Sequence, residues 1–394
     1  MQKRSLEDDM AKMFAVIGER AERVASAEAF IDRHDPVFNL ANNLHPSILH
    51  LQIATVRDES NLARTYQLTN NTPNAPLPPF RAGQYLVVRD NVDQGVASRP
   101  YTISSSPHRS NTFYEITISH KKDGFFSKHA WENWKEGMVI KAEGPFGYFY
   151  HEPLRDKNKL IALAGGSGIT PFYSMIQDVI ATNKTPHITL IYGSTSEHEI
   201  IFVEQLNQLA QANPENIKIF HVISDPSPGY MGLTGLISME LIKSIIDEPT
   251  DYSYFICGPE AMYRYCLSEL ALLNLPPRLI RKELSGNFKD VIKFHDYPSD
   301  IGGREVTIEY TFRTKEGKLK ANTAETILTA FERAGLEPPA HCRSGECGFC
   351  RTLLQSGEIY VLKETDRRRA ADLEYGYIHP CSTYPIGDLK VDII

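Results

Sequence analysis

Four of the six cysteines gather near the C-terminus, at Cys342, Cys347, Cys350 and Cys381. Their pattern is C-x4-C-x2-C, followed after 30 residues by the fourth cysteine. A structural zinc ion usually takes its thiolates from two C-x2-C pairs, and Cys381 has no close second cysteine. The observed spacing is that of plant-type 2Fe–2S clusters. The pattern therefore favours an iron–sulfur cluster over zinc, and the small residues Ser344, Gly345 and Gly348 suit a loop that wraps it closely.

A second set of residues could bind a flavin. It consists of Arg99, Pro100, Tyr101 and Thr102, together with Gly124, Phe125, Phe126 and Ser127 at the start of a helical stretch. An arginine can bind a phosphate, an aromatic ring offers a plane for the flavin, and a hydroxyl can bond near its reactive nitrogen. The backbone amides at a helix start can cradle a phosphate. The R-x-Y-S/T motif alone would also fit a strand with an exposed arginine. The prediction of a flavin site therefore depends on this motif and the helix start occurring together.

A glycine-rich turn lies between an apolar strand and a helix, at Gly165, Gly166, Ser167, Gly168, Thr170 and Pro171. Glycines let the backbone approach a pyrophosphate, whose charge a helix N-terminus favours. The turn departs from G-x-G-x-x-G because Pro171 stands where the third glycine would be. It predicts a dinucleotide site.

The choice between NADH and NADPH depends on charge near the ribose. NADPH needs Arg or Lys beside its 2′-phosphate. Neither Ser194–Glu199 nor Ser224–Pro226, which follow the second and third strands of this region, contains Arg or Lys. Asp225 would repel a phosphate. We expect Ser194 and Asp225 to lie at the cofactor, and NADH to be preferred over NADPH.

Three scaffolds must position these residues. Short strands with Gly and Pro turns over 46–155 predict an antiparallel β-barrel. Strands alternating with helices over 156–285 predict an α/β unit with a parallel sheet. A linker, 286–304, then leads to a last unit, 305–394, which contains the cysteine loop.

Residues 1–45 lie outside that scheme. Met10, Met13, Phe14 and Ile17 recur at helical spacing and predict a helical N-terminal extension. Its apolar face either packs on its own protein or serves as a dimerisation or partner-docking arm.

The composition limits the function classes. The 394 residues carry a net charge of −7 with a pI of about 6.0, so nucleic acid is not an expected partner. No apolar run approaches the ~20 residues that span a bilayer. The first residues have charges and lack the apolar stretch of a signal peptide. We therefore expect no membrane span and a cytoplasmic protein, with its oligomeric state left open.

Residues 305–394 resemble a plant-type ferredoxin domain. The resemblance rests on the cysteine spacing, the strand 306–312, the helix 324–334 and the segment 378–381. It implies a β-grasp (α+β) fold that holds one 2Fe–2S cluster. It also implies that the first two cysteines bind one iron and the last two bind the other.

The preceding two units resemble the ferredoxin–NADP⁺ reductase superfamily, which carries the same flavin set and the G-G-x-G-x-T-P turn. The resemblance implies that Arg99 binds a flavin phosphate, that Tyr101 packs on the isoalloxazine and that Thr102 bonds near N5. It implies that residues 124–127 hold the pyrophosphate. The segment 144–149 is similar to that of members using FAD, so FAD is favoured and FMN is the alternative.

Cys257, Gly258 and Pro259 match a second signature of that superfamily. By resemblance, Thr170 and Cys257 lie beside the nicotinamide. A buried thiol at a strand end would explain Cys257 equally well, and both interpretations are compatible.

The order of the three units resembles NADH-dependent reductases of the phthalate dioxygenase reductase and vanillate demethylase reductase type. This implies hydride transfer from NADH to the flavin, then single electrons to the cluster and on to a separate redox partner such as a terminal oxygenase. One alternative is a reductase for an anaerobic partner, such as the hybrid cluster protein or another metalloreductase. The other is a zinc-stabilised flavoprotein whose last domain is a docking module.

Overall fold

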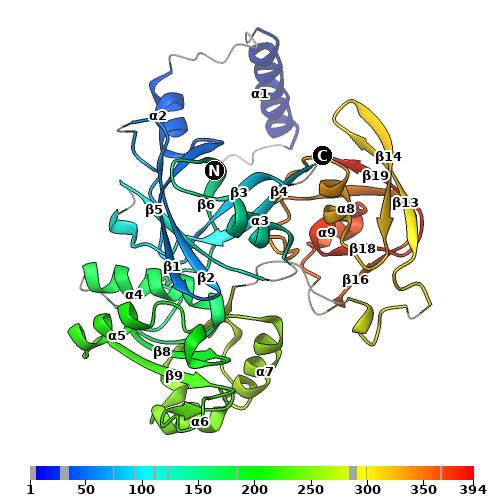
Figure 1. The fold of residues 1–394 in the computed structure, drawn as a ribbon. Helices are drawn as coiled ribbons and strands as arrows, with labels where there is room; N and C mark the ends of the chain where they lie inside the picture. The colour runs from blue at the N-terminus through cyan, green and yellow to red at the C-terminus, as the bar shows by residue number, and fades with distance from the viewer. Residues whose placement is uncertain are drawn as a thin grey trace. The chain divides into compact units, whose positions relative to one another are not determined.

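A computed structural model describes residues 6–26, 35–73, 75–92, 95–109, 112–121, 124–182, 185–283, 291–298, 300–363 and 366–394 (Figure 1). The chain divides into two compact units, Met1–Asn43 and Leu44–Ile394. Part of the predicted linker, at 286–290 and 299, lies outside the described residues.

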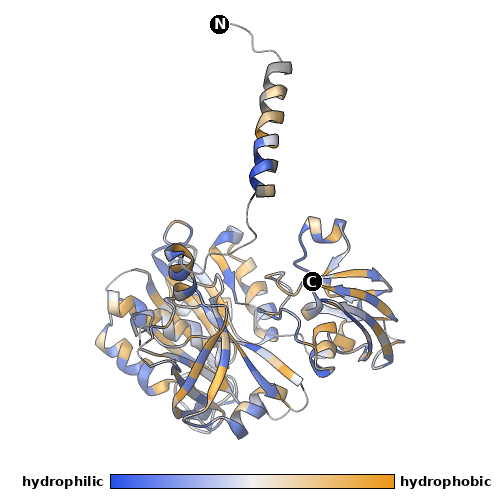
Figure 2. Cartoon of the chain, turned by 90° about the horizontal axis from the view of Figure 1, so that it is seen from above, coloured by the Kyte–Doolittle hydropathy of each residue, from blue (hydrophilic) through white to orange (hydrophobic). Residues whose placement is uncertain are grey.

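The N-terminal segment is helical, as expected, with α1 (Leu6–Ser26) and α2 (Pro36–Leu44). Figure 2 shows that α1 carries both hydrophobic and hydrophilic residues. Its apolar side chains Met10, Met13, Phe14 and Ile17 are exposed. The two proposed roles of this face stay predictions.

The following unit is a six-stranded antiparallel sheet in the order β4-β3-β6-β1-β2-β5. Its strands are β1 (Leu49–Ser60), β2 (Ala63–Asn70), β3 (Tyr85–Val92), β4 (Gly95–Thr102), β5 (Tyr114–Ser119) and β6 (Val139–Phe146), and α3 (Phe125–Asn133) lies between β5 and β6. Ile103, just after β4, bridges to Ile116 of β5, so the sheet curls back on itself. Alternate residues such as Leu51 and Ile53 point inward, which confirms the predicted barrel.

The next unit is a parallel sheet in the order β10-β9-β8-β7-β11-β12. Its strands are β7 (Lys159–Gly165), β8 (His187–Ser194), β9 (Ile217–Ile223), β10 (Leu233–Thr234), β11 (Ser253–Cys257) and β12 (Ile280–Lys282). Its helices are α4 (Thr170–Thr182), α5 (Val203–Ala212), α6 (Met239–Ile245) and α7 (Glu260–Ala271). Strand β7 is buried on both faces because α4 and α5 share one apolar cluster with it, and α6 and α7 share the other.

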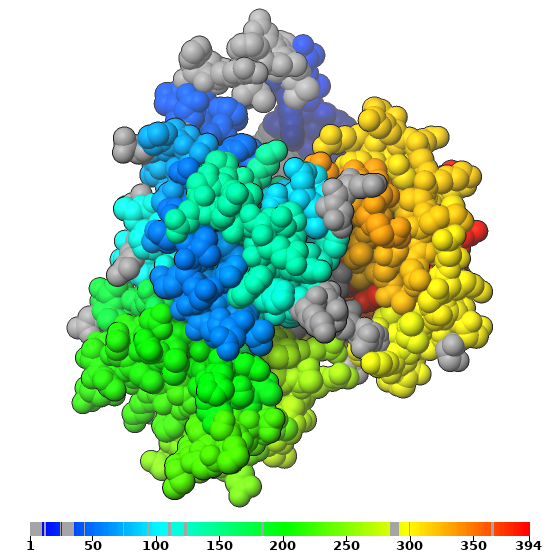
Figure 3. Space-filling view, in the orientation of Figure 1, coloured from blue at the N-terminus to red at the C-terminus, as the bar shows by residue number. Residues whose placement is uncertain are grey.

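Helix α4 also joins this unit to the barrel. The Ser174 hydroxyl donates to the Ser105 carbonyl at 2.7 Å, and the Gln177 amide donates to the Ser104 carbonyl at 3.0 Å. Figure 3 shows the parallel-sheet unit, in green, directly against the barrel. The start of α4 is thereby fixed relative to the segment that follows β4.

The C-terminal unit is a five-stranded mixed sheet in the order β14-β13-β19-β15-β17, with a separate pair β16-β18. The elements are β13 (Glu305–Phe312), β14 (Lys315–Asn322), α8 (Ile327–Arg333), β15 (Thr352–Ser356), β16 (Ile359–Val361), α9 (Ala370–Glu374), β17 (Tyr377–Ile378), β18 (Thr383–Pro385) and β19 (Leu389–Ile393). Strand β13 pairs antiparallel with β14 and parallel with β19, and Phe331 of α8 packs in the same core. This is the predicted β-grasp fold.

Candidate functional site

The flavin motif lies on β4, the strand at the end of the barrel sheet. Arg99 and Tyr101 are two residues apart and therefore share one face of the strand. The Phe126 ring of α3 lies 5.9 Å from the Tyr101 ring and 6.0 Å from the Arg99 guanidinium carbon. Burial raises the pKa of Tyr101, which stays protonated. The structure thus brings together the arginine, the ring and the helix start that the sequence singled out, with Pro100 and Thr102 on the same strand.

Helix α3 begins where a phosphate cradle was predicted. Gly124 is the N-cap residue and provides no side-chain cap. A Cβ atom on Gly124 would lie 2.2 Å from the Ser127 hydroxyl, so a side chain at this position would require the Ser127 side chain to move. The amides of Phe125, Phe126 and Ser127 belong to the first helical turn, which has no intrahelical acceptors. These residues fit an anionic group.

The glycine-rich turn and the Cys257 segment meet at the carboxyl edge of the parallel sheet. A Cβ atom on Gly168 would lie 2.0 Å from the Cys257 carbonyl oxygen, and one on Gly258 would lie 3.2 Å from the Gly165 Cα atom. Only glycine permits this approach of two backbones. The Thr170 hydroxyl donates to the Ser167 carbonyl at 3.1 Å and stabilises the turn before Pro171.

The backbone at Gly166 is open to solvent, whereas Cys257 is buried. Gly166 has a φ of +52°, and a Cβ atom there would meet nothing within 4 Å, so its backbone faces open space. By contrast, a Cβ atom on the preceding Gly165 would lie 2.9 Å from the Pro259 side chain, and burial raises the pKa of the Cys257 thiol. The thiol is therefore protonated at neutral pH. Such an edge, at the ends of parallel strands, is where open α/β sheets bind ligands.

Ser194 is the last residue of β8, and Asp225 lies just after the neighbouring strand β9, at that same edge. The Ser224 amide donates to the Ser194 carbonyl at 3.0 Å, and the Asp225 amide donates to the Thr195 carbonyl at 2.8 Å. The Glu197 carboxylate accepts from the Ser227 amide nearby. The two segments that were expected to contact the ribose therefore lie side by side, and they contain the acidic residues Glu197 and Asp225.

The four C-terminal cysteines come together in one loop. Cys350 and Cys381 have their sulfurs 3.4 Å apart, and hydrogen bonds from Cys347 and Cys381 lower the pKa of the Cys342 thiol. Backbone amides also point at the sulfurs. Gly345 donates to Cys381 at 3.2 Å, Cys347 to Cys342 at 3.4 Å, Phe349 to Cys347 at 3.4 Å and Ser344 to Cys342 at 3.5 Å. Donors aimed at sulfur stabilise thiolates, so the loop fits an anionic iron–sulfur cluster.

The backbone conformation of the cysteine loop explains two of the small residues in it. Gly345 and Gly348 adopt φ of +78° and +70°, which favour glycine. Arg343 adopts φ +57° without being a glycine, which the sequence did not indicate. Within the described residues, no group of three or more His, Cys, Asp or Glu side chains has the geometry of a single-ion site.

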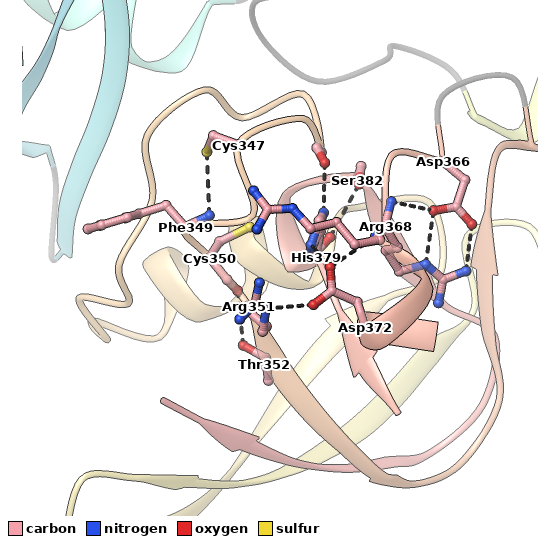
Figure 4. A network of polar contacts seen from close by, with 12 residues as sticks. Cys347, Phe349, Cys350, Arg351, Thr352, Asp366, Arg368, Asp372, His379 and Ser382 are labelled. Carbon is pink, nitrogen blue, oxygen red and sulfur yellow. Dashed lines mark hydrogen bonds and ion pairs between the residues drawn. The ribbon is translucent and has the colours of Figure 1, made fainter. Parts of the chain in front are cut away.

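A buried polar network supports this loop from inside its own unit (Figure 4). Asp372, only 3% exposed, pairs with Arg351 at 2.7 Å and lies 3.4 Å from His379. It also accepts from the Arg369 amide at 3.0 Å and so caps α9. His379 bonds to the Gly345 carbonyl at 2.7 Å. No motif in the sequence pointed to this network.

An aromatic stack joins the loop to the barrel. The His341 ring lies between Phe146 of β6 and Phe349, with centroid distances of 4.1 Å and 3.5 Å. Its Nε2 atom is 3.2 Å from the Glu143 carboxylate. Burial alone would raise the pKa of Glu143, but the bond to His341 and the charge of Arg89 hold it below the usual value. The residue before the first cluster cysteine is therefore anchored on the barrel.

Glu283, just after β12, is a further residue that sequence reasoning missed. Its amide donates to Ile256 at 3.0 Å and its carbonyl accepts from the Tyr263 hydroxyl, so it lies next to the strand that ends at Cys257. Burial, followed by the charges of Glu346 and Cys342, raises the pKa of its carboxyl to about 8. A perturbed carboxyl in such a place is a typical feature of a functional site.

Family models match all three units. The oxidoreductase FAD-binding domain matches residues 50–151, the oxidoreductase NAD-binding domain 162–267 and the 2Fe-2S iron-sulfur cluster binding domain 311–385. Among the described residues, we find no helix with the length and apolar character needed to cross a membrane.

Known proteins resemble the chain over most of its length. One component of the 1,2-phenylacetyl-CoA epoxidase from Escherichia coli (strain K12) is 29% identical over 351 residues, which cover 87% of this chain and 96% of that protein. The ferredoxin reductase component of 3-ketosteroid-9-alpha-monooxygenase from Mycobacterium tuberculosis is 28% identical, covering 86% and 94%. The solved structure of phthalate dioxygenase reductase is 22% identical with a TM-score of 0.64, covering 88% of this chain and 98% of that one, and so shares the fold.

These matches agree with the barrel, the parallel sheet and the β-grasp unit in content and in order. The chain is therefore an oxidoreductase with a FAD-binding domain, a NAD-binding domain and a C-terminal 2Fe-2S iron-sulfur cluster binding domain, and it shares the fold of phthalate dioxygenase reductase.

Proposed function

We propose that this protein takes electrons from NADH and delivers them singly to a separate redox protein, the terminal component of an oxygenase. When bound, a flavin accepts hydride from a nicotinamide and gives up electrons one at a time, and a 2Fe–2S cluster carries one electron. The observation that carries the proposal is the placement of the cysteine loop directly on the barrel that holds the flavin motif, through His341 and Phe146.

The residues have the following proposed roles at the flavin. Arg99 binds a flavin phosphate, Tyr101 covers the isoalloxazine and Thr102 donates near N5. The first turn of α3, residues 124–127, holds the pyrophosphate through its amides. FAD is preferred over FMN, in line with the domain match.

At the nicotinamide half, residues 165–171 hold the dinucleotide pyrophosphate, and Thr170 and Cys257 bound the nicotinamide together with Gly258 and Pro259. Ser194 and Asp225 contact the adenosine ribose. The acidic groups at this edge, Glu197 and Asp225, disfavour a 2′-phosphate, so NADH is preferred.

In the ferredoxin domain, we assign Cys342 and Cys347 to one iron and Cys350 and Cys381 to the other. The 3.4 Å distance between the Cys350 and Cys381 sulfurs supports the second pair. We also propose the domain boundaries 46–155, 156–285 and 305–394, with the extension and linker as predicted above. The partner is taken to be an oxygenase component because the relatives named above serve epoxidase and monooxygenase systems.

An anaerobic absorption titration tests the proposal. Purified protein should show broad bands beyond flavin absorption, and NADH should bleach flavin and cluster bands faster than NADPH does. Released flavin should chromatograph as FAD. A pure flavin spectrum with stoichiometric zinc would contradict the cluster, and faster bleaching by NADPH would contradict only the cofactor preference.

The Asp225→Arg variant tests the cofactor preference directly. Replacing an anion with a cation beside the ribose should shift the kcat/KM ratio toward NADPH by roughly tenfold or more, since ~1.4 kcal/mol of differential binding is tenfold. Steady-state kinetics with both nucleotides measure this ratio. An unchanged ratio would place Asp225 away from the ribose.

A further inference from the structure

Glu332, at the C-terminal end of α8, is a buried carboxylate with partners on two domains. Arg343 donates to its two oxygens from two nitrogens, at 2.6 and 3.1 Å. From the barrel, Arg99 donates to it at 3.3 Å, and Ser98 donates from its amide at 3.3 Å and its hydroxyl at 3.4 Å. Glu332 is 8% exposed and Arg343 is 2% exposed. One carboxylate therefore connects the flavin strand β4 to the cysteine loop.

The backbones of the two domains also touch at this place. A Cβ atom on Gly95, the first residue of β4, would lie 2.5 Å from the Glu332 carbonyl oxygen. A backbone oxygen at that distance has no room to give way, so only glycine fits at the start of β4. The contact of β4 with α8 is thus a close-packed interface in which Glu332 supplies both a backbone and a side-chain contact.

Two guanidinium groups share the Glu332 carboxylate. They are those of Arg99, whose side chain is 24% exposed, and the buried Arg343. Burial and the charge of Arg343 lower the pKa of Arg99, while Glu332 acts in the opposite direction. Glu332 therefore accepts from both arginines and offsets their mutual repulsion.

The bidentate pair also explains the backbone of the loop. Arg343 directly follows Cys342 and holds a left-handed conformation that non-glycine residues seldom adopt. Such conformations persist where surrounding contacts over-determine them. The two bonds to Glu332 supply such contacts, so the orientation of the loop depends on a residue of α8.

We propose that Glu332 is a positioning residue that clasps the ferredoxin domain to β4 of the flavin barrel and sets the placement of the cysteine loop relative to the flavin strand. The expected effect on electron transfer from flavin to cluster, one electron at a time, rests on the proposed function. Its structural content, the clasp between β4 and α8, stands on the contacts alone. Glu332 touches neither substrate nor nicotinamide, so it should act on the internal step and leave hydride delivery intact.

The experiment compares the full-length, cofactor-loaded wild type with Glu332→Ala and a matched control, Glu325→Ala. Glu325 is also a carboxylate next to α8 that accepts from an arginine, Arg333, and its contacts with Arg333 and the Asn322 amide stay within its own domain. Backbone hydrogen exchange over residues 95–102 reports on the clasp. Anaerobic stopped-flow absorbance separates flavin bleaching from cluster bleaching.

Glu332→Ala should keep its flavin and iron content and its rate of flavin bleaching by NADH within about twofold. Exchange over β4 should rise by roughly tenfold, the equivalent of ~1.4 kcal/mol. Cluster bleaching should slow by roughly tenfold or more, because small misplacements of reacting groups have effects of that size. Glu325→Ala should match the wild type in all of these.

Wild-type exchange and wild-type cluster bleaching in Glu332→Ala would overturn the proposal. If Glu332→Ala loses iron, the Gly95→Ala variant tests the proposal instead, because its new methyl group disturbs the contact between β4 and α8 from the barrel side. Faster β4 exchange with an intact cluster then supports the clasp, and unchanged exchange overturns it. If the wild type itself lacks cluster absorption or NADH bleaching, the proposed function fails, whereas the exchange comparison still decides on the clasp.

Discussion

Two buried carboxylates contact the cysteine loop, and they differ in what else they hold. Glu332 and Asp372 each pair with the arginine that directly follows a cluster cysteine, Arg343 and Arg351 respectively. The other partners of Glu332 lie on the barrel. The other partners of Asp372, the His379 ring and the amide at the start of α9, lie in the ferredoxin domain itself. One carboxylate therefore joins two domains, and the other builds the loop.

This difference teaches how one short loop meets two requirements. A cluster needs its ligands held in place whether or not the neighbouring domain is docked, and that is a task for contacts within the domain. The approach to the flavin strand is a separate task, which needs contacts that cross the boundary. Substitutions at the two positions should therefore fail in different ways.

The largest effect is expected for Asp372→Ala. The change takes the carboxylate partner from Arg351, whose side chain is 38% exposed, and removes the cap of α9. Loss of the cap and of the other bonds to this buried carboxylate costs about 2–4 kcal/mol. We expect a lower unfolding midpoint for the ferredoxin domain and loss of iron. Chemical denaturation followed by absorbance of the cluster, with iron analysis, measures both.

The matched control is Asp366→Asn. Asp366 pairs with Arg368 at 2.6 Å in the neighbouring segment, but both side chains are partly exposed. Its loss should cost about 1 kcal/mol or less and leave iron content unchanged. Equal effects of the two substitutions would show that Asp372 has no special place in the loop.

The cysteine loop and the glycine turns could be predicted from the sequence, but the residues that support them could not. The cysteine spacing is local, and small residues were expected where the loop wraps closely. The left-handed backbone of Gly345 and Gly348 is a further reason for glycine that the structure adds. Helix α8 begins at Ile327 rather than Ala324 because the Thr326 hydroxyl accepts from the Thr329 amide and so acts as the N-cap. Such a boundary depends on one hydrogen bond.

Glu332 was not predictable because its partner Ser98 is 234 residues away in the chain. No periodicity connects two such positions. Asp372 and Glu283 belong to segments without motifs, and their surroundings arise only when loops from different strands meet. The sequence motifs therefore pointed to the residues of the two glycine turns and the cysteine loop, but gave no signal for the buried carboxyls that pack against them.

A third carboxyl, that of the partly buried Glu283, extends the comparison through its pH dependence. Despite burial, a backbone bond from Arg369 and the charge of Arg351 bring the pKa of Asp372 below its usual value, whereas burial raises the pKa of Glu283 to about 8. Between pH 4.5 and 8 the folded chain keeps a proton on Glu283 that the unfolded chain releases. The free energy of unfolding should therefore fall as the pH rises through this window.

Glu283→Gln should remove that fall and leave the variant more stable than the wild type at pH 9 by about 1–3 kcal/mol, with little difference at pH 5. Asp372 has the opposite sign, since its contribution is present above its ordinary pKa and is lost as the pH falls. Denaturation midpoints at about pH 5, 7 and 9 test both directions. A wild-type slope retained in Glu283→Gln would assign the pH dependence to another group.

The smallest effect is expected for Ser98→Ala, which trims the barrel side of the Glu332 contact. The substitution removes one hydroxyl donor at 3.4 Å and leaves the amide of residue 98, Arg99 and the Arg343 pair in place. A single net hydrogen bond is worth about 0.5–1.5 kcal/mol, so exchange over β4 should rise only about two- to tenfold. Combining Ser98→Ala with Glu332→Ala should add nothing further, because the donor has already lost its acceptor. Hydrogen exchange on the four proteins of this cycle measures the coupling, and additive effects would mean that Ser98 and Glu332 act independently, contrary to the clasp.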